Sequence, residues 1–193
     1  MNAQQITLVS YGHFEKEILR IISDKVFAVY GLPVNMEETH FDLSNFYDPN
    51  RRQYDGNKLL KNTDDHSIGN IKTIALFNVD IFIPILTYIF GQAYLNGNSG
   101  VVSAYRLKNE LYGLKPNKFI LIERLAKVII HELGHTFGLK HCYNNDCVMK
   151  STNYVEDIDQ KNAVFCSACK EEYSLGIQKK LFMENNGEIT SNT

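Results

Sequence analysis

Residues 131–141 read His-Glu-Leu-Gly-His-Thr-Phe-Gly-Leu-Lys-His, and this is the most informative stretch of the sequence. His131 and His135 are four residues apart, so on a helix their imidazoles lie one turn apart on one face, where both can reach a single ion. Gly138 lets the backbone leave the helix at a positive φ, and His141 follows as a candidate third ligand. Three protein ligands leave a coordination position open for water, which is the signature of a catalytic zinc site.

The helix that carries this pair is predicted over residues 117–137, with Asn117 as its N-cap. One apolar stripe repeats at helical spacing along it: Ile122, Ala126, Ile129, Leu133 and Phe137. The two histidines lie about 180° around the helix from this stripe. That position argues against a pair of satisfied core histidines.

Two further residues fit a catalytic zinc site. Glu132 follows His131 but is rotated off the ligand axis, so it can accept a proton from a bound water as general base without being a ligand. HExxHxxGxxH is the metzincin signature, in which a methionine on a tight turn lies beneath the metal. Met149 is the candidate for that turn.

The rest of the chain alternates strands and helices. Strands are expected over residues 6–10, 71–79, 88–95 and 101–107, an extended segment over 33–42, and further helices over 14–30, 51–61 and from 166 or 167 onward. The turn at residues 96–100 makes 88–95 and 101–107 a hairpin. This alternation predicts an α/β or α+β fold with a mixed sheet.

Length and charge narrow the class of protein. The 193 residues predict a single domain, 1–193, with a sheet and helix part over 1–140 and a small lobe over 141–193. Lys and Arg number 20, Asp and Glu 22, and the net charge is −2, so no nucleic-acid or membrane surface is expected. With no secretion signal in view, we expect a cytoplasmic monomer.

Four cysteines cluster in the last third of the chain: Cys142, Cys147, Cys166 and Cys169. Two close pairs separated by a loop can supply four thiolates to a structural zinc ion, and residues 150–165 have little apolar content to order them otherwise. A thioredoxin-like Cys-x-x-Cys would explain only one pair. Four unrelated free thiols are the other alternative.

Taken together, these motifs resemble the archaemetzincins. The resemblance rests on HELGHTFGLKHC at 131–142, on Cys147-Val148-Met149 and on Cys166-x-x-Cys169, and it extends to YDPNRRQY at 47–54. It covers residues 5 to 180 approximately. It implies a zincin-like fold with a twisted mixed sheet, a long active-site helix and a small zinc-stabilised C-terminal lobe. It also implies two zinc ions per chain, one catalytic and one structural, and peptidase activity.

The predicted function is therefore that of a zinc metallopeptidase acting on peptide or protein substrates. The strand expected at 101–107 is the candidate sheet edge that pairs with an extended substrate, through Val101, Val102, Ser103, Ala104 and Tyr105. Arg51 to Tyr54 is either a substrate-binding feature or a solvated helix end. Two alternatives stay open: a zinc-stabilised module that binds peptides without cutting them, and an aminopeptidase.

Overall fold

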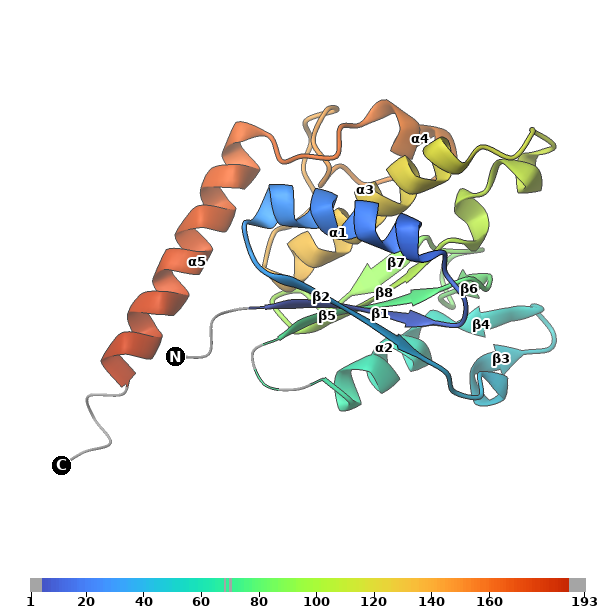
Figure 1. The fold of residues 1–193 in the computed structure, drawn as a ribbon, viewed down its shortest axis with the longest axis horizontal. Helices are drawn as coiled ribbons and strands as arrows, with labels where there is room; N and C mark the ends of the chain where they lie inside the picture. The colour runs from blue at the N-terminus through green and yellow to red at the C-terminus, as the bar shows by residue number, and fades with distance from the viewer. Residues whose placement is uncertain (1–4, 68, 70, 188–193) are drawn as a thin grey trace.

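A five-stranded mixed sheet runs through the molecule (Figure 1). The computed structural model describes residues 5–67, 69 and 71–187, with side chains up to residue 178. In spatial order the strands are β2 (Val34–Thr39), β1 (Ile6–Tyr11), β5 (Lys72–Phe77), β8 (Ser99–Ser103) and β7 (Gly91–Ala93). The first four are parallel and β7 is antiparallel to β8. A smaller sheet holds β3 (Tyr47–Asp48), β4 (Gln53–Asp55) and β6 (Ile81–Phe82). The mixed-sheet prediction is confirmed.

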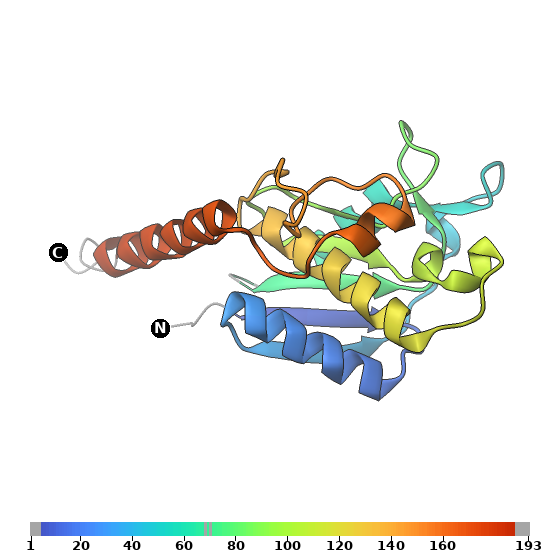
Figure 2. The ribbon, with the colours of Figure 1, turned by 90° about the horizontal axis from the view of Figure 1, so that it is seen from above.

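Helices cover both faces of the large sheet. Figure 2 shows α1 (Lys16–Tyr30) and α3 (Lys118–Thr136) side by side over one face, and α2 (Gly56–Asp65) lies on the opposite face in Figure 1. The other helical elements are η1 (Ser44–Phe46), η2 (Tyr105–Leu107), η3 (Asn109–Tyr112), α4 (Val155–Gln160) and α5 (Ser167–Gly187). Because helices lie on both sides, β5 is buried along its whole length.

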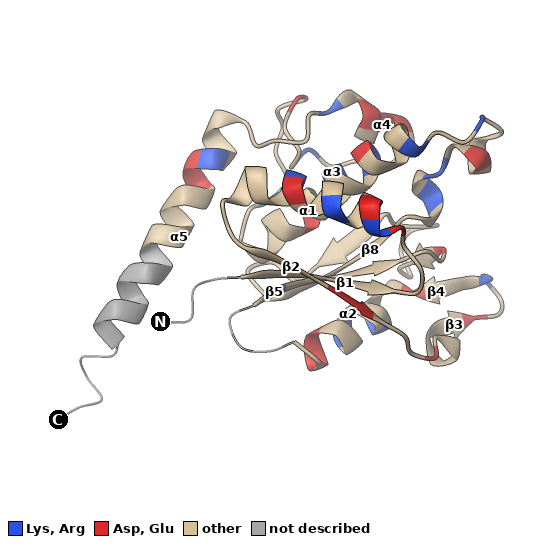
Figure 3. Cartoon of the chain, in the orientation of Figure 1, with Lys and Arg blue, Asp and Glu red and all other residues tan. Residues whose placement is uncertain are grey.

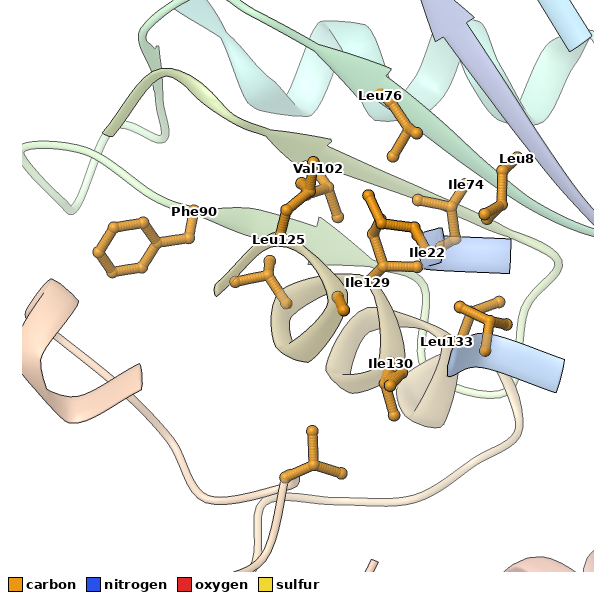
Figure 4. Close-up of a cluster of buried hydrophobic side chains, with 14 of the residues drawn as sticks. Leu8, Ile22, Ile74, Leu76, Phe90, Val102, Leu125, Ile129, Ile130 and Leu133 are labelled. Carbon is orange, nitrogen blue, oxygen red and sulfur yellow. The ribbon is translucent and has the colours of Figure 1, made fainter. Parts of the chain in front are cut away.

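The main core fills the layer between the sheet and the α1–α3 pair. Leu8, Ile74 and Val102 point from the strands toward Ile22 of α1 and Ile129 of α3 (Figure 4). The same cluster continues beyond α3 into the C-terminal part, where Val148, Met149, Val155, Ile158 and Tyr173 join it. A second, smaller cluster lies under α2. Helix α3 is thus packed on several sides at once, which holds its functional residues rigidly.

The sequence dictates both ends of α3, and the predicted helix over 117–137 is confirmed. Asn117 Oδ1 accepts a hydrogen bond from the N–H of Ile120 at 3.1 Å, as an N-cap should. At the other end Gly138 has φ +92°, and the N–H of Leu139 returns to the carbonyl of Gly134 at 2.9 Å. The side opposite the apolar stripe is covered too, since His131 is only 8% exposed.

The helix predicted over 51–61 is displaced in the structure, where α2 covers Gly56–Asp65. Asp55 is its N-cap, because the carboxylate accepts from the N–H of Asn57 at 2.9 Å. Residues 53–55 are instead in β4, paired with β3 and β6. Arg52, with φ +56°, lies in the β3–β4 turn. Tertiary pairing therefore overrides the weak helical periodicity of residues 51–55.

The predicted hairpin is confirmed, but its place in the sheet was wrong. β7 and β8 pair in antiparallel register, with Gly91 opposite Val102 and Ala93 opposite Gly100. β8 also pairs with β5, so residues 101–103 are interior and β7 is the edge. Ala104 follows β8 as a buried residue, and Tyr105 begins η2. Val101, Val102, Ser103, Ala104 and Tyr105 therefore do not form the edge that we expected to bind substrate.

The C-terminal segment agrees with the sequence except at one short helix. α5 starts at Ser167 as predicted and extends away from the body (Figures 1 and 2). α4 lies within residues 150–165, where the sequence analysis predicted no helix. Within the described residues, no helix combines the length and apolar character needed to cross a bilayer. Acidic and basic residues alternate along α1, and both kinds occur on the other elements (Figure 3). The net charge of the chain is −2.

Candidate active site

His131 and His135 point their Nε2 atoms at each other from successive turns of α3. Each Nδ1 lies 2.8 Å from a backbone carbonyl, that of Val148 for His131 and that of Leu139 for His135. A carbonyl oxygen can only accept, so each Nδ1 carries the hydrogen and each Nε2 keeps its lone pair. The two Nε2 atoms are 3.1 Å apart, so two lone pairs face each other with no hydrogen between them.

His141 completes the set from the turn that follows Gly138. Its ring centroid lies 5.3 Å from that of His131 and 4.9 Å from that of His135. The three candidate ligand atoms all lie within 4.8 Å of one another. The structure therefore brings together the three histidines that the motif spacing predicted, with His141 on the solvent side.

The three imidazoles fit a zinc ion in distance and in chemistry. Two nitrogen ligands at 2.0–2.1 Å in tetrahedral geometry lie about 3.3–3.4 Å apart, close to the observed Nε2 separation. Burial lowers the pKa of all three histidines, most strongly for His131, so the rings are neutral near pH 7. Neutral imidazoles with backbone acceptors on the far nitrogen are the usual state of zinc ligands.

Glu132 lies beside this centre as a buried carboxyl, 6% exposed. Burial raises its pKa to about 8, while the charge of Lys161 acts in the opposite direction. Its side chain packs directly on Gly91 of the edge strand, where a Cβ atom would be 2.7 Å from Glu132 Cγ and 2.8 Å from Oε1. Sequence reasoning missed Gly91, since a glycine in a short strand carries no distinguishing pattern.

The turn at residues 147–150 passes beneath the histidines. Met149 is fully buried, and its sulfur packs so closely on Gly134 that a Cβ atom there would overlap it. The carbonyl of Val148, in this turn, accepts two hydrogen bonds. One comes from His131 Nδ1 and the other, at 2.8 Å, from Lys161 Nζ. Lys161 Nζ also donates to the carbonyl of Lys150 at 2.9 Å. The turn therefore orients His131 directly.

The four cysteines converge immediately behind this turn. Cys142 and Cys147 come from the loop after His141, and Cys166 and Cys169 from the start of α5. All four sulfurs lie within 4.8 Å of one another, and Cys142 Sγ is 3.8 Å from Cys166 Sγ. Two sulfur ligands at about 2.3 Å from one tetrahedral zinc ion lie about 3.8 Å apart.

Hydrogen bonds to sulfur favour the thiolate form within this cluster, while burial raises the pKa of the Cys147 and Cys169 thiols. The N–H of Asn144 donates to Cys142 Sγ and the N–H of Cys166 to Cys147 Sγ, both at 3.4 Å. A bond from the Cys169 N–H lowers the pKa of Cys166 to about 7, so part of this thiol ionises near neutrality. Convergence of both pairs does not fit four unrelated thiols or a redox role for one pair. The cluster fits a tetrahedral metal ion.

A cleft of about 480 Å³ opens over the histidines. β7 lines it through Gly91, Gln92 and Ala93, and residues 151–154 contribute another part of its wall. β7 is the outermost strand of the sheet and lines the same cleft as the three histidines. Tyr154, the tyrosine nearest after Met149, lies in this wall and is 65% exposed.

Residues 83–88 form the rim of the cleft, and the RRQY segment holds them. Arg51 donates to the carbonyls of Leu86 and Thr87 at 2.7 and 3.1 Å. Its guanidinium also stacks over the Phe82 ring at 4.1 Å. Gln53 donates to the same Thr87 carbonyl at 3.0 Å. The segment is thus a support for the cleft rim and not a solvated helix end.

The fold and the three-histidine centre on an HExxH helix define a zinc metallopeptidase of the metzincin type. The model of peptidase family M54 matches residues 13–174. The chain belongs to this family, and its relatives are archaemetzincins. The archaemetzincin of Haloarcula marismortui is 33% identical over 168 residues, which cover 86% of this chain and 96% of that protein.

Two solved structures show the same fold. The zinc-dependent peptidase of Methanocorpusculum labreanum has a TM-score of 0.80 at 29% identity, covering 87% of this chain and 99% of that one. The archaemetzincin of Methanopyrus kandleri has a TM-score of 0.79 at 30% identity, covering 91% and 96%. The predicted resemblance to the archaemetzincins is confirmed.

Proposed function

We propose that this chain hydrolyses peptide bonds with a zinc ion held by His131, His135 and His141 and with Glu132 as general base. The observation that carries the proposal is the pair of facing Nε2 lone pairs 3.1 Å apart, with a carboxyl group beside them. A zinc ion bound there supplies a Lewis acid that polarises a carbonyl and lowers the pKa of bound water to about 7.

The roles of the chain's own residues follow from their positions. Glu132 accepts the proton of the attacking water and passes it to the leaving amine. The free edge of β7 binds the substrate backbone as an added strand. This role was expected for residues 101–105, but β8 is an interior strand. Met149 packs against Gly134 between the turns that carry the two histidines and keeps them in register.

We further propose that Cys142, Cys147, Cys166 and Cys169 hold a second, structural zinc ion. The sulfur separation of 3.8 Å and the N–H···S bonds support this assignment. A structural zinc site of this kind contributes directly to folding. The charge balance supports a chain that does not bind nucleic acid, and we propose a cytoplasmic, monomeric enzyme.

The two alternative functions have less support. An aminopeptidase needs an acidic anchor for the free amine, and Glu132 is the only acidic residue among the described residues that line the cleft. A peptide-binding module that does not cut has no use for a buried carboxyl beside the open coordination position.

The Glu132→Gln variant tests the proposal, because it keeps the size of the side chain and removes the base. We expect both zinc ions to remain bound and turnover of a mixed peptide library, followed by mass spectrometry, to fall by about 10²–10⁴. The comparison uses equal zinc occupancy on both proteins. Equal cleavage rates, or no cleavage by zinc-loaded wild type, would contradict the proposal.

A further inference from the structure

Lys161 places a buried ammonium group at the wall of the cleft. Its side chain is 2% exposed and follows α4, yet it lines the cavity over the histidines. Nζ donates to the carbonyls of Val148 and Lys150, at 2.8 and 2.9 Å. An ammonium group has three donors, so these two bonds leave one donor for a group bound in the cleft.

The residues around Lys161 strengthen the attraction of its positive charge for an anion in the cleft. Most of the residues that line the cleft together with Lys161 are uncharged, and six of them are apolar or aromatic: Ile83, Leu86, Tyr88, Ile89, Phe90 and Val128. Among the described lining residues Lys161 is the only lysine or arginine, and Glu132 the only carboxylate. These two attract each other without forming an ion pair. With zinc on three neutral imidazoles, the cleft is net positive, and a low-dielectric wall strengthens its attraction for an anion.

We propose that Lys161 makes the cleft selective for substrates that place a carboxylate next to the scissile bond. The inference rests on the proposed peptidase function and names its substrate class. The carboxylate has two sources: the side chain of an Asp or Glu residue, or the free C-terminus of a peptide cut near its end. Either would accept the third hydrogen of the ammonium in a charge-assisted bond.

A purely structural role is the competing explanation, since Lys161 also holds the turn at 147–150. That role uses only the two donors already bound to Val148 and Lys150. It would change stability or zinc affinity when Lys161 is replaced. It would not change the ratio between an acidic substrate and its neutral isostere, so this ratio separates the two explanations.

The first experiment uses matched peptides built on the best-cleaved neutral sequence of a library. Each position around the cut is occupied by Glu or Gln, and each peptide is made with a free or an amidated C-terminus. We expect kcat/KM to favour the peptide that carries the recognised carboxylate over its neutral counterpart by about 10-fold or more, as for a charge-assisted bond. If the side chain is the source, Glu is favoured over Gln at one position and amidation has no effect. If the C-terminus is the source, the free acid is favoured over the amide and Glu and Gln peptides are cleaved alike.

The second experiment compares Lys161→Met with Lys161→Arg at equal zinc occupancy. Lys161→Met keeps an apolar stem without charge and should reduce the wild-type preference, whether Glu over Gln or free acid over amide, to a ratio of about 1. Lys161→Arg keeps the charge and should retain most of the preference. An unchanged ratio in Lys161→Met, or no preference in wild type, would overturn the inference.

Binding to zinc-loaded Glu132→Gln keeps this test separate from the proposed function. Calorimetry with the same matched peptides measures the preference without any cleavage. Tighter binding of the peptide that carries the recognised carboxylate, with no cleavage by wild type, would support the inference and overturn the peptidase function. Cleavage of all the matched peptides at equal rates, with equal binding, would support the function and overturn the inference.

Discussion

At the scale of single residues, Gly91 shows how the edge strand determines the position of the general base. The Glu132 side chain occupies the space where any other residue at 91 would place its Cβ atom. A strand glycine costs about 0.5–1 kcal/mol of stability relative to alanine. That cost is offset here by a buried carboxyl held against the metal centre.

The Gly91→Ala variant should therefore impair catalysis while leaving the metal in place. A Cβ atom at 2.7 Å from Glu132 Cγ forces that side chain to move. We expect kcat to fall by about 10–100-fold, because small displacements of a catalytic group are costly, with zinc content unchanged. Gly176→Ala is the control, since the nearest atom to its Cβ is 4.0 Å away. Wild-type turnover in Gly91→Ala would contradict this role.

The buried carboxyl of Glu132 should make the stability of the zinc-free protein depend on pH. In zinc-free protein burial raises that pKa to about 8, so the native state holds a proton that the unfolded state releases above about 4.5. The contribution of Glu132 to the free energy of unfolding is therefore lost as the pH rises from about 4.5 to about 8. The free energy of unfolding of Glu132→Gln minus that of wild type should rise by about 1.4 kcal/mol per pH unit in this window. Urea titrations of chelated protein at several pH values measure it, and a constant difference would contradict the raised pKa.

At the scale of elements, the RRQY segment supports the loop that bounds the cleft. Arg51 contacts that loop through two carbonyls and stacks on Phe82, while Gln53 bridges Thr87 and the carboxylate of Asp80. Arg106 joins this network by a bidentate pair with Asp80, with both distances 2.6 Å. Strand β4 and the rim loop therefore behave as one unit.

Replacing Arg51 by Met should loosen the rim without touching the metal. Two carbonyl contacts disappear, so we expect KM for peptides to rise several-fold with zinc content and Tm of the core little changed. The neighbouring Arg52→Met variant is the control, since Arg52 is exposed in the β3–β4 turn. Equal KM values for the two variants would show that the network does not position the rim.

At the scale of the whole molecule, one core extends from the sheet past the three histidines to the four cysteines. Leu8 and Ile74 of the sheet belong to the same buried cluster as Val148 and Tyr173 of the C-terminal part. Tyr30 reinforces this link, because its hydroxyl donates to the Ile130 carbonyl and its own carbonyl accepts from Tyr173. We propose on this basis that residues 1–140 and 141–193 form a single domain.

Loss of the four-cysteine site should therefore affect the entire fold. In Cys166→Ser we expect one zinc ion fewer per chain and a loss of several kcal/mol of stability, because structural zinc contributes directly to folding. The neighbouring Val164→Ala, at an exposed position, should change stability by less than about 0.5 kcal/mol. Metal analysis and thermal unfolding check both variants. Equal Tm values for Cys166→Ser and wild type would contradict a structural zinc.

Features that depend on short-range geometry could be predicted from the sequence. The spacing of His131, His135 and Gly138 defines one helix face and its exit, and Asn117 marks the helix start, because α-helical periodicity is local. The four-cysteine cluster and the family resemblance were likewise predicted from the spacing of residues in short motifs. Each of these features needs only residues that are close together in the chain or carry a distinctive spacing.

Which strand is the edge, and which side chains surround the three histidines, could be seen only in the folded chain. A strand's alternation is the same whether one or both of its edges are paired, so the sequence could not show that β8 is interior and β7 exposed. Gly91 against Glu132 and Arg51 on the rim join residues 35 or more positions apart, and Lys161 reaches the cleft wall from 20 positions beyond His141. Such contacts depend on the packing of the whole chain, and no local pattern encodes them.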